Sequence, residues 1–245
     1  VGPDFPISVK LNSADFQKGG FNFEDSLQVV QWLEAASVDL VEISGGTYEQ
    51  PALMGADGIE EKEEQNVAPS TKAREAYFVD FAKAMQDAVK VPLMVTGGFS
   101  PNMVGQLSPF ASTMNHRGTA MLHRHLTSEV HDAGGKICLQ LLHAGRYSYH
   151  PFSVSASATK APITPFKARA LSTKGVDKQI DDFVSAAKLA KLARYDGVEV
   201  MGSEGYFINQ FLCERTNKRT DKWGGPFENR MQLPVEIVRR MREAV

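Results

Sequence analysis

The sequence predicts an α/β protein built from five parallel βα units. Short apolar runs of about 5–8 residues alternate with longer stretches in which apolar residues recur at helical spacing. Glycine pairs follow two of the apolar runs, at Gly45-Gly46 and Gly97-Gly98, and a helical pattern comes after each. A strand, a turn and a helix repeated along a chain are typical of a parallel sheet or a (β/α) barrel.

Each element has its own local signal. Predicted strands are buried apolar runs, and predicted helices carry an apolar stripe of period 3.6. The strands are expected at Pro6–Ser13, Val38–Ser44, Val91–Thr96, Lys136–Leu142 and Gly197–Val200. The helices are expected at Glu24–Ala36, Thr71–Val89, Asn115–Ala133, Lys174–Tyr195 and within Met231–Val245.

Composition bounds the class of protein. The chain has 245 residues, 42% of them hydrophobic and 23% charged, which is enough for one sizeable core. A net charge of −2 gives no reason to expect nucleic acid or an anionic membrane as a partner. No apolar run approaches the roughly 20 residues that span a bilayer. Cys138 and Cys213 lack a CxxC neighbour, so we expect no metal site and no disulfide framework, and a reducing cytoplasmic location.

A polar stretch after the last predicted strand is the first candidate for chemistry. Gly202 and Gly205 allow the backbone to turn directly after Gly197–Val200, and charged residues follow. A parallel α/β protein presents its functional groups at the carboxyl ends of its strands. From residue types alone, an ordinary surface loop explains this stretch equally well.

Longer motifs decide between these two interpretations. The words GVEVMGSEGYFINQFL, RTNKRTDKWGG and ENR closely resemble the old yellow enzyme family of flavin oxidoreductases, especially the branch that includes bacterial 2,4-dienoyl-CoA reductase. The resemblance recurs in KICLQLLHAGRYSYHP (136–151), FPISVKLNSADFQKGGF (5–21) and VDLVEISGGTYEQPALMG (38–55). It implies a TIM-barrel-type fold, bound FMN, NAD(P)H as reductant and a small-molecule substrate.

The segments do not follow the family's order. Residues 1–99 resemble the family's strands five to seven, and residues 100–245 resemble the region from the loop after strand two through the helix after strand four. We therefore expect residues 1–245 to form a single rearranged domain. Nothing resembles the first or eighth strand, the phosphate loop after strand eight or the iron–sulfur domain of dienoyl-CoA reductases, so no iron–sulfur cluster is expected.

Five strands are too few to close a barrel comfortably, because eight strands just fill the interior with side chains. An open five-stranded sheet leaves two unprotected edges. We therefore expect two copies to associate edge to edge into a ten-stranded barrel, as a symmetric homodimer. The rival expectation is an open half-barrel.

Four residues are expected to bind the cofactor. A lysine within an apolar strand is costly unless paired or functional, and the resemblance places Lys10 beside the pyrimidine edge of FMN. By the same resemblance Gln140 hydrogen-bonds the flavin ring, and Gly97 and Gly98 contact its phosphate. The alternatives are an edge-strand lysine that reaches water and a glutamine bonded to neighbouring backbone.

Tyr206 is the predicted catalytic residue, because reduction of a C=C bond needs a proton that a tyrosine hydroxyl can supply. The alternative is a packing aromatic. Many family members have two histidines in this loop, where this chain has Met201 and Glu204. Glu204, His143 and Arg146 are expected to contact substrate, although His143 is equally explained as a residue that orients its loop.

Three functions remain open at this point. The first is an FMN-dependent oxidoreductase that passes hydride from NAD(P)H to an electron-poor alkene. The second is a non-catalytic, self-associating βα scaffold, derived from gene rearrangement or design, with weak or no flavin binding. The third is a phosphate-binding barrel without flavin. Retention of flavin separates the first two.

Overall fold

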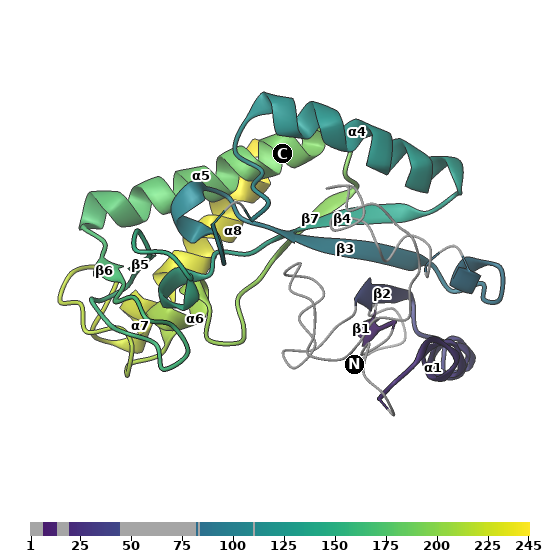
Figure 1. Cartoon of the computed structure of the whole chain (residues 1–245), viewed down its shortest axis with the longest axis horizontal. Coiled ribbons are helices and arrows are strands. Elements are labelled where there is room, and N and C mark those ends of the chain that lie inside the picture. Colours follow the sequence, from purple (N-terminus) through teal and green to yellow (C-terminus); the bar gives the residue numbers. More distant parts are fainter. Residues whose placement is uncertain (1–6, 14–19, 45–81, 83, 110) are drawn as a thin grey trace. The chain divides into compact units, whose positions relative to one another are not determined.

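A computed structural model describes residues 7–13, 20–44, 82, 84–109 and 111–245 (Figure 1). The chain divides into two compact units. The first unit comprises residues 1–97 and 126–138, and the second unit comprises residues 98–125 and 139–245. Each unit has its own apolar core. Strands β3 (Leu93–Phe99) and β4 (Lys136–Leu141) and helix α4 (Arg117–Asp132) have residues in both units.

The first unit contains parallel strands. Strand β1 (Ser8–Asn12) pairs with β2 (Leu40–Ser44), and the register runs from Ser8 opposite Leu40 to Asn12 opposite Ser44. Strand β2 pairs in turn with β3, with Val41 opposite Leu93. The buried residues Val30, Val41, Ile43, Met85, Val89, Val91 and Leu93 form the core of this unit.

Helix α1 (Phe23–Ala35) connects β1 to β2, and its start is fixed locally. The Asn22 side chain accepts a hydrogen bond from the Asp25 backbone N–H, and the Asp25 carboxylate accepts one from the Asn22 N–H. This reciprocal pair is a capping box, which satisfies two N–H groups that the first turn of a helix leaves unbonded.

In the second unit, the carboxyl ends of β3, β4 and β7 (Gly197–Val200) lie side by side, with β4 in the middle. The Leu142 N–H donates to the Phe99 carbonyl at 2.9 Å, and the Met201 N–H donates to the Leu141 carbonyl at 3.0 Å. Polar side chains that follow these three strands are therefore brought to one place.

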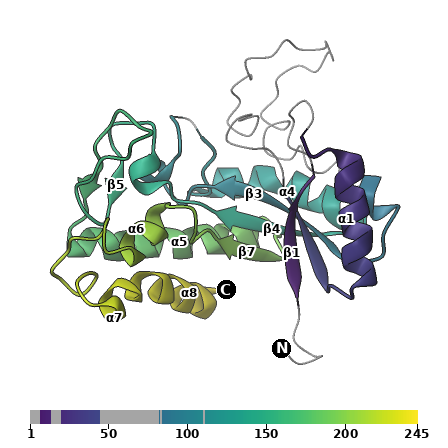
Figure 2. The same cartoon turned by 90° about the horizontal axis from the view of Figure 1, so that it is seen from below.

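Two long helices provide much of the core of the second unit. Helix α5 (Thr173–Leu192) buries Val176, Ile180 and Phe183, and α8 (Gln232–Ala244) buries residues four apart. The two helices lie side by side (Figures 1 and 2). In each helix the buried residues recur every three or four positions, which places one apolar stripe of the helix on the core.

Short elements carry the connections of the second unit. They are the 3-10 helices η2 (Met103–Gly105) and η3 (Gly145–Tyr147), the strands β5 (Val154–Ser155) and β6 (Arg169–Ala170), and the helices α6 (Phe207–Leu212) and α7 (Phe227–Arg230). No helix of the described ranges has the length and apolar character needed to cross a membrane.

The α/β class with parallel strands is confirmed. Two boundaries were predicted wrongly. Strand β3 continues through Gly97-Gly98 to Phe99 instead of ending at Thr96, because glycine accepts an extended backbone as readily as a turn, and α5 ends at Leu192 instead of Tyr195. Most of the helix predicted at Thr71–Val89 and the pair Gly45-Gly46 lie outside the described residues. The single domain, the count of five units and closure by a second copy remain predictions.

Candidate functional site

Gln140 lies on β4 and is buried, at 7% exposure. Its Nε2 donates to the Glu199 carboxylate on β7 at 2.9 Å. A Cβ added to Gly98 on the neighbouring strand would lie 3.4 Å from the Gln140 Oε1, so the backbone there closely approaches the amide. The predicted cofactor residues Gln140 and Gly98 are thus brought together, and Glu199 joins them.

The β4 loop (residues 142–150) is organised around His143, which is 1% exposed. The Gly145 N–H donates to His143 Nδ1 at 3.1 Å, so Nε2 carries the proton and donates to Gln179 Oε1 at 3.0 Å. The imidazole also stacks on Phe207, with ring centroids 4.0 Å apart. Both ring nitrogens are therefore occupied, which favours the loop-orienting alternative for His143.

The environment of His143 keeps its ring neutral. Burial lowers the pKa of His143 from 6.5 to about 4, although the hydrogen bond to Gln179 acts in the opposite direction. The nearby His150 contributes to this lowering of the pKa. A neutral, fully bonded imidazole is suited to fixing a loop.

Arg146 lies on the same loop and is partly exposed. Its guanidinium carbon lies 5.4 Å from the centroid of the Tyr147 ring. Its Nε is buried and has no hydrogen-bond acceptor among the described residues. Arg146 therefore retains donor capacity on the loop where a substrate contact is predicted.

The β7 turn (residues 201–206) places Tyr206. Glu204 has φ 62° and Gly205 has φ 79°, and the Tyr206 N–H donates to the Ser203 carbonyl at 3.2 Å. Positive φ at both central residues is the pattern of a type I′ turn, and it is unfavourable for a glutamate. The turn leaves Glu204 exposed and buries Tyr206 to 6% exposure.

The two loops are in contact. The Tyr206 ring meets the Tyr147 ring edge to face, with centroids 5.9 Å apart, and the Phe207 N–H donates to the His143 carbonyl at 3.0 Å. The second unit thus brings together the predicted residues His143, Arg146 and Tyr206.

Lys10 and Gly97 belong to the first unit. Lys10 Nζ lies 2.8 Å from Glu42 Oε1, and the two residues are direct register partners on β1 and β2. The Lys10 side chain is 34% exposed. Pairing and partial exposure together account for a lysine in this strand, so its cofactor role stays a prediction.

The motif RTNKRTDKWGG, which follows α6, acts as a scaffold. Asn217 Nδ2 donates to the carbonyls of Phe211 and Trp223, and Arg219 pairs with Asp221. The hydrogen bond from Arg219 lowers the pKa of Asp221 to about 2. These contacts fix the loop in which the motif lies.

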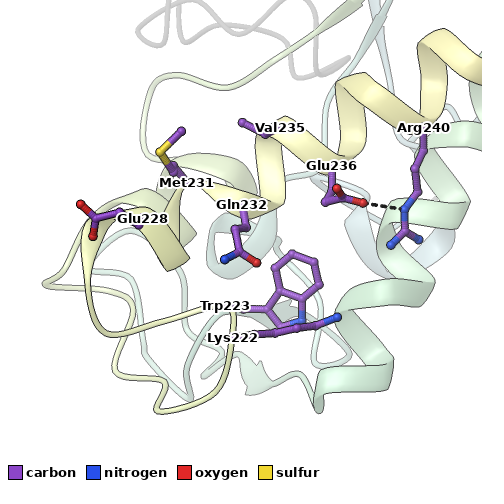
Figure 3. Close-up of a pocket in the computed structure, with 8 residues that line it drawn as sticks. All are labelled: Lys222, Trp223, Glu228, Met231, Gln232, Val235, Glu236 and Arg240. Atoms are coloured by element: carbon purple, nitrogen blue, oxygen red, sulfur yellow. Dashed lines mark hydrogen bonds and ion pairs between the residues drawn. The ribbon is translucent and has the colours of Figure 1, made fainter.

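A cavity of about 320 Å³ lies beside α7 and α8 (Figure 3). Its lining combines apolar side chains with an ion pair in which Arg240 Nε lies 3.0 Å from Glu236 Oε2. The lining residues are Lys222, Trp223, Glu228, Met231, Gln232, Val235, Glu236 and Arg240. None of the predicted site residues is among them, so we do not place the site there.

Sequence reasoning missed Glu199, Gln179 and Gln210. Glu199 had a signal, because it is the one charged residue in the half-buried strand GVEV. The two glutamines lie on helices, where an amide looks like an ordinary surface residue. The described residues contain no group of three or more His, Cys, Asp or Glu side chains suited to a metal ion.

Several known proteins are similar to this chain. An NADH oxidase of Thermoanaerobacter brockii is 42% identical over 125 residues, which are 49% of this chain and 19% of that protein. A putative 12-oxophytodienoate reductase 6 of Oryza sativa subsp. japonica is 32% identical over 187 residues, covering 70% of this chain and 48% of that protein.

A solved structure of morphinone reductase in complex with tetrahydroNAD superposes with a TM-score of 0.59 and 28% identity, over 62% of this chain and 48% of that chain. This chain therefore spans about half or less of the length of the proteins that it matches. The family model described as NADH:flavin oxidoreductase / NADH oxidase matches residues 63–245. The chain belongs to this family, which the sequence resemblance predicted under the name old yellow enzyme.

Proposed function

We propose that the protein is an FMN-dependent oxidoreductase that passes hydride from NAD(P)H to an activated C=C bond of a small molecule. Family membership supports the flavin and the nicotinamide reductant. The observation that carries the proposal is the β7 turn, which holds a buried tyrosine at the strand ends beside the β4 loop.

The cofactor proposal rests on groups whose chemistry suits a flavin ring. Bound FMN supplies a hydride acceptor and donor at its N5. Gln140 offers a buried amide, and Gly98 removes side-chain bulk beside it. Lys10 contributes a positive charge for the pyrimidine edge, and Gly97 with Gly98 offers backbone N–H groups to the phosphate.

Tyr206 is the proposed proton donor. Its hydroxyl gives a proton to the substrate carbon that does not receive hydride, and burial of the ring excludes water from that transfer. Arg146 and Glu204 are the proposed substrate contacts. His143 is retained with them because it positions the β4 loop from which Arg146 extends.

Replacing Tyr206 with Phe tests the catalytic assignment. We expect alkene turnover to fall about 100-fold, a typical contribution of a general acid, while reduction of the flavin by NADPH continues. Tyr149→Phe is the matched control, because Tyr149 is an exposed tyrosine of the same unit. Unchanged turnover in Tyr206→Phe would show that another group donates the proton.

The alternative is a self-associating βα scaffold that holds flavin weakly or not at all. It rests on the expectation that no segment of the sequence resembles the family's first or eighth strand. A visible absorption spectrum after incubation with FMN and desalting separates the two functions. A retained flavin band supports the oxidoreductase, and a colourless protein supports the scaffold.

Closure by a second copy is part of both proposals. Among the described residues, β1 is hydrogen-bonded as a strand to β2 alone, which leaves it as an edge. Size-exclusion chromatography with light scattering should give a dimer. A folded, monodisperse monomer would contradict the ten-stranded barrel.

A further inference from the structure

Gln210 has a buried amide side chain that forms hydrogen bonds to both the β4 loop and the β7 turn. It lies on α6, four residues after Tyr206, and is 1% exposed. A buried amide that lacked partners would be costly, so each polar atom of this side chain needs a partner. The partners come from three different segments of the second unit.

The amide oxygen of Gln210 accepts two hydrogen bonds. The Arg146 backbone N–H donates to Oε1 at 3.0 Å, and the Ser155 hydroxyl donates to it at 2.8 Å. The first bond reaches the β4 loop next to its predicted substrate residue. The second anchors the same oxygen to β5.

The amide nitrogen of Gln210 donates two hydrogen bonds. Nε2 donates to the Gly205 carbonyl at 2.8 Å and to the Ala144 carbonyl at 3.3 Å. Gly205 directly precedes Tyr206 in the β7 turn, and Ala144 belongs to the β4 loop. The amide group of one side chain therefore forms hydrogen bonds to both loops.

Steric fit supports the same connection. Gly145 has φ 62°, and a Cβ added to it would come within 2.3 Å of Gln210 Oε1. A Cβ added to Gly205, at φ 79°, would come within 2.7 Å of the Tyr147 hydroxyl. Both loops thus have a glycine where they approach their partner.

We propose that Gln210 is a positioning residue that holds Tyr206 and Arg146 in one arrangement. It does so by donating to the carbonyl next to Tyr206 and by accepting from the N–H of Arg146. The assignment of Tyr206 as proton donor rests on the proposed function. The connection between the two loops does not.

Hydrogen exchange on the intact chain tests the connection without any activity. Gln210→Met keeps the length of the side chain and removes all four hydrogen bonds. We expect amide exchange to become at least about tenfold faster both in residues 144–147 and in residues 203–207. Ser155→Ala is the matched control, because it removes one bond to Oε1 without touching either loop.

Faster exchange in only one of the two segments, or in neither, would overturn the proposal. If Gln210→Met does not fold, Gln210→Glu replaces it. A protonated carboxyl can still donate to the Gly205 carbonyl, whereas an ionised one cannot. Relative to the unmodified protein at each pH, exchange in both segments should therefore slow as the pH is lowered from 8 to 5.5, and a ratio between the two proteins that does not change with pH would count against Gln210.

A kinetic comparison tests the catalytic consequence. Gln210→Met should lower kcat for the alkene about tenfold with little change in KM, and should lower it no further in a Tyr206→Phe background. An equal loss in both backgrounds would show that Gln210 does not act through Tyr206. If the unmodified protein has no alkene turnover, the proposed function fails, and the exchange experiment alone decides the role of Gln210.

Discussion

The two units accommodate polar side chains by different means. In the first unit, Lys10 is paired with Glu42 directly across β1 and β2 and stays partly exposed. In the second unit, His143, Gln179 and Gln210 are almost fully buried and bond backbone and side chains of several segments.

The first unit thus uses an ion pair of two side chains, whereas the second unit uses a network of buried hydrogen bonds. In the Lys10–Glu42 pair, water reaches the lysine but hardly reaches Glu42, which is 7% exposed, so solvent can replace the carboxylate as a partner of the lysine. A buried network has no such replacement, so the loss of one member leaves the others unsatisfied. We therefore expect the β4 loop and the β7 turn of the second unit to be the more rigid and the more sensitive to substitution.

The largest effect is expected from Gly145→Ala. A Cβ at this position would collide with Gln210, and the positive φ disfavours any L side chain. Together, overpacking and backbone strain should lower the free energy of unfolding by about 3 kcal/mol or more. Urea denaturation at constant pH measures the change.

Gly225→Ala is the control for Gly145→Ala. Gly225 lies in the same unit with φ 81°, but an added Cβ would meet nothing within 4 Å. Only backbone strain remains, so the expected loss is about 1 kcal/mol. Equal losses at both glycines would mean that the contact with Gln210 is not tight.

A smaller effect is expected from pH. The pKa of His143 is about 4 in the folded protein and ordinarily 6.5, so the unfolded chain takes up a proton first as the pH falls. The stabilisation is present above pH 6.5 and is lost as the pH falls toward 4, by about 2 kcal/mol between pH 7.5 and 5. Burial lowers the pKa of His150 as well, which acts with the same sign.

Denaturation at a series of pH values measures this loss. His143→Gln removes the titrating ring, so its unfolding free energy should change less between pH 7.5 and 5. An identical pH slope in the two proteins would contradict the assignment of the slope to His143.

Local patterns were enough to predict strands β1, β2, β3, β4 and β7 and the residues near their ends, but not the two-residue strands β5 and β6. Gln140 and Tyr206 stood out because a polar residue inside an apolar run and a tyrosine after two glycines are visible within a few residues. The family resemblance then gave them roles. Both residues lie where strand ends meet, as a parallel sheet requires.

The partners of these residues could not be predicted in the same way. Gln140 bonds Glu199 at a separation of 59 residues, His143 bonds Gln179 at 36 and Arg146 bonds Gln210 at 64. Such pairs depend on how helices and loops dock, and no local period encodes docking. The pairing of Lys10 with Glu42 was accessible, because each is the third residue of its strand and the strands pair in register.

The smallest effect is expected at this pair, and it decides whether Lys10 does more than balance a charge. Lys10→Met should lower the free energy of unfolding by about 1 kcal/mol, because the buried Glu42 carboxylate loses one partner. Adding Glu42→Gln should recover part of that loss. If Lys10 also contacts the flavin, FMN should bind about tenfold more weakly to both variants that lack the lysine, and normally to Glu42→Gln alone. If FMN affinity instead changes only in step with the free energy of unfolding of each variant, Lys10 contributes to the ion pair alone. The flavin site would then consist of residues of the second unit.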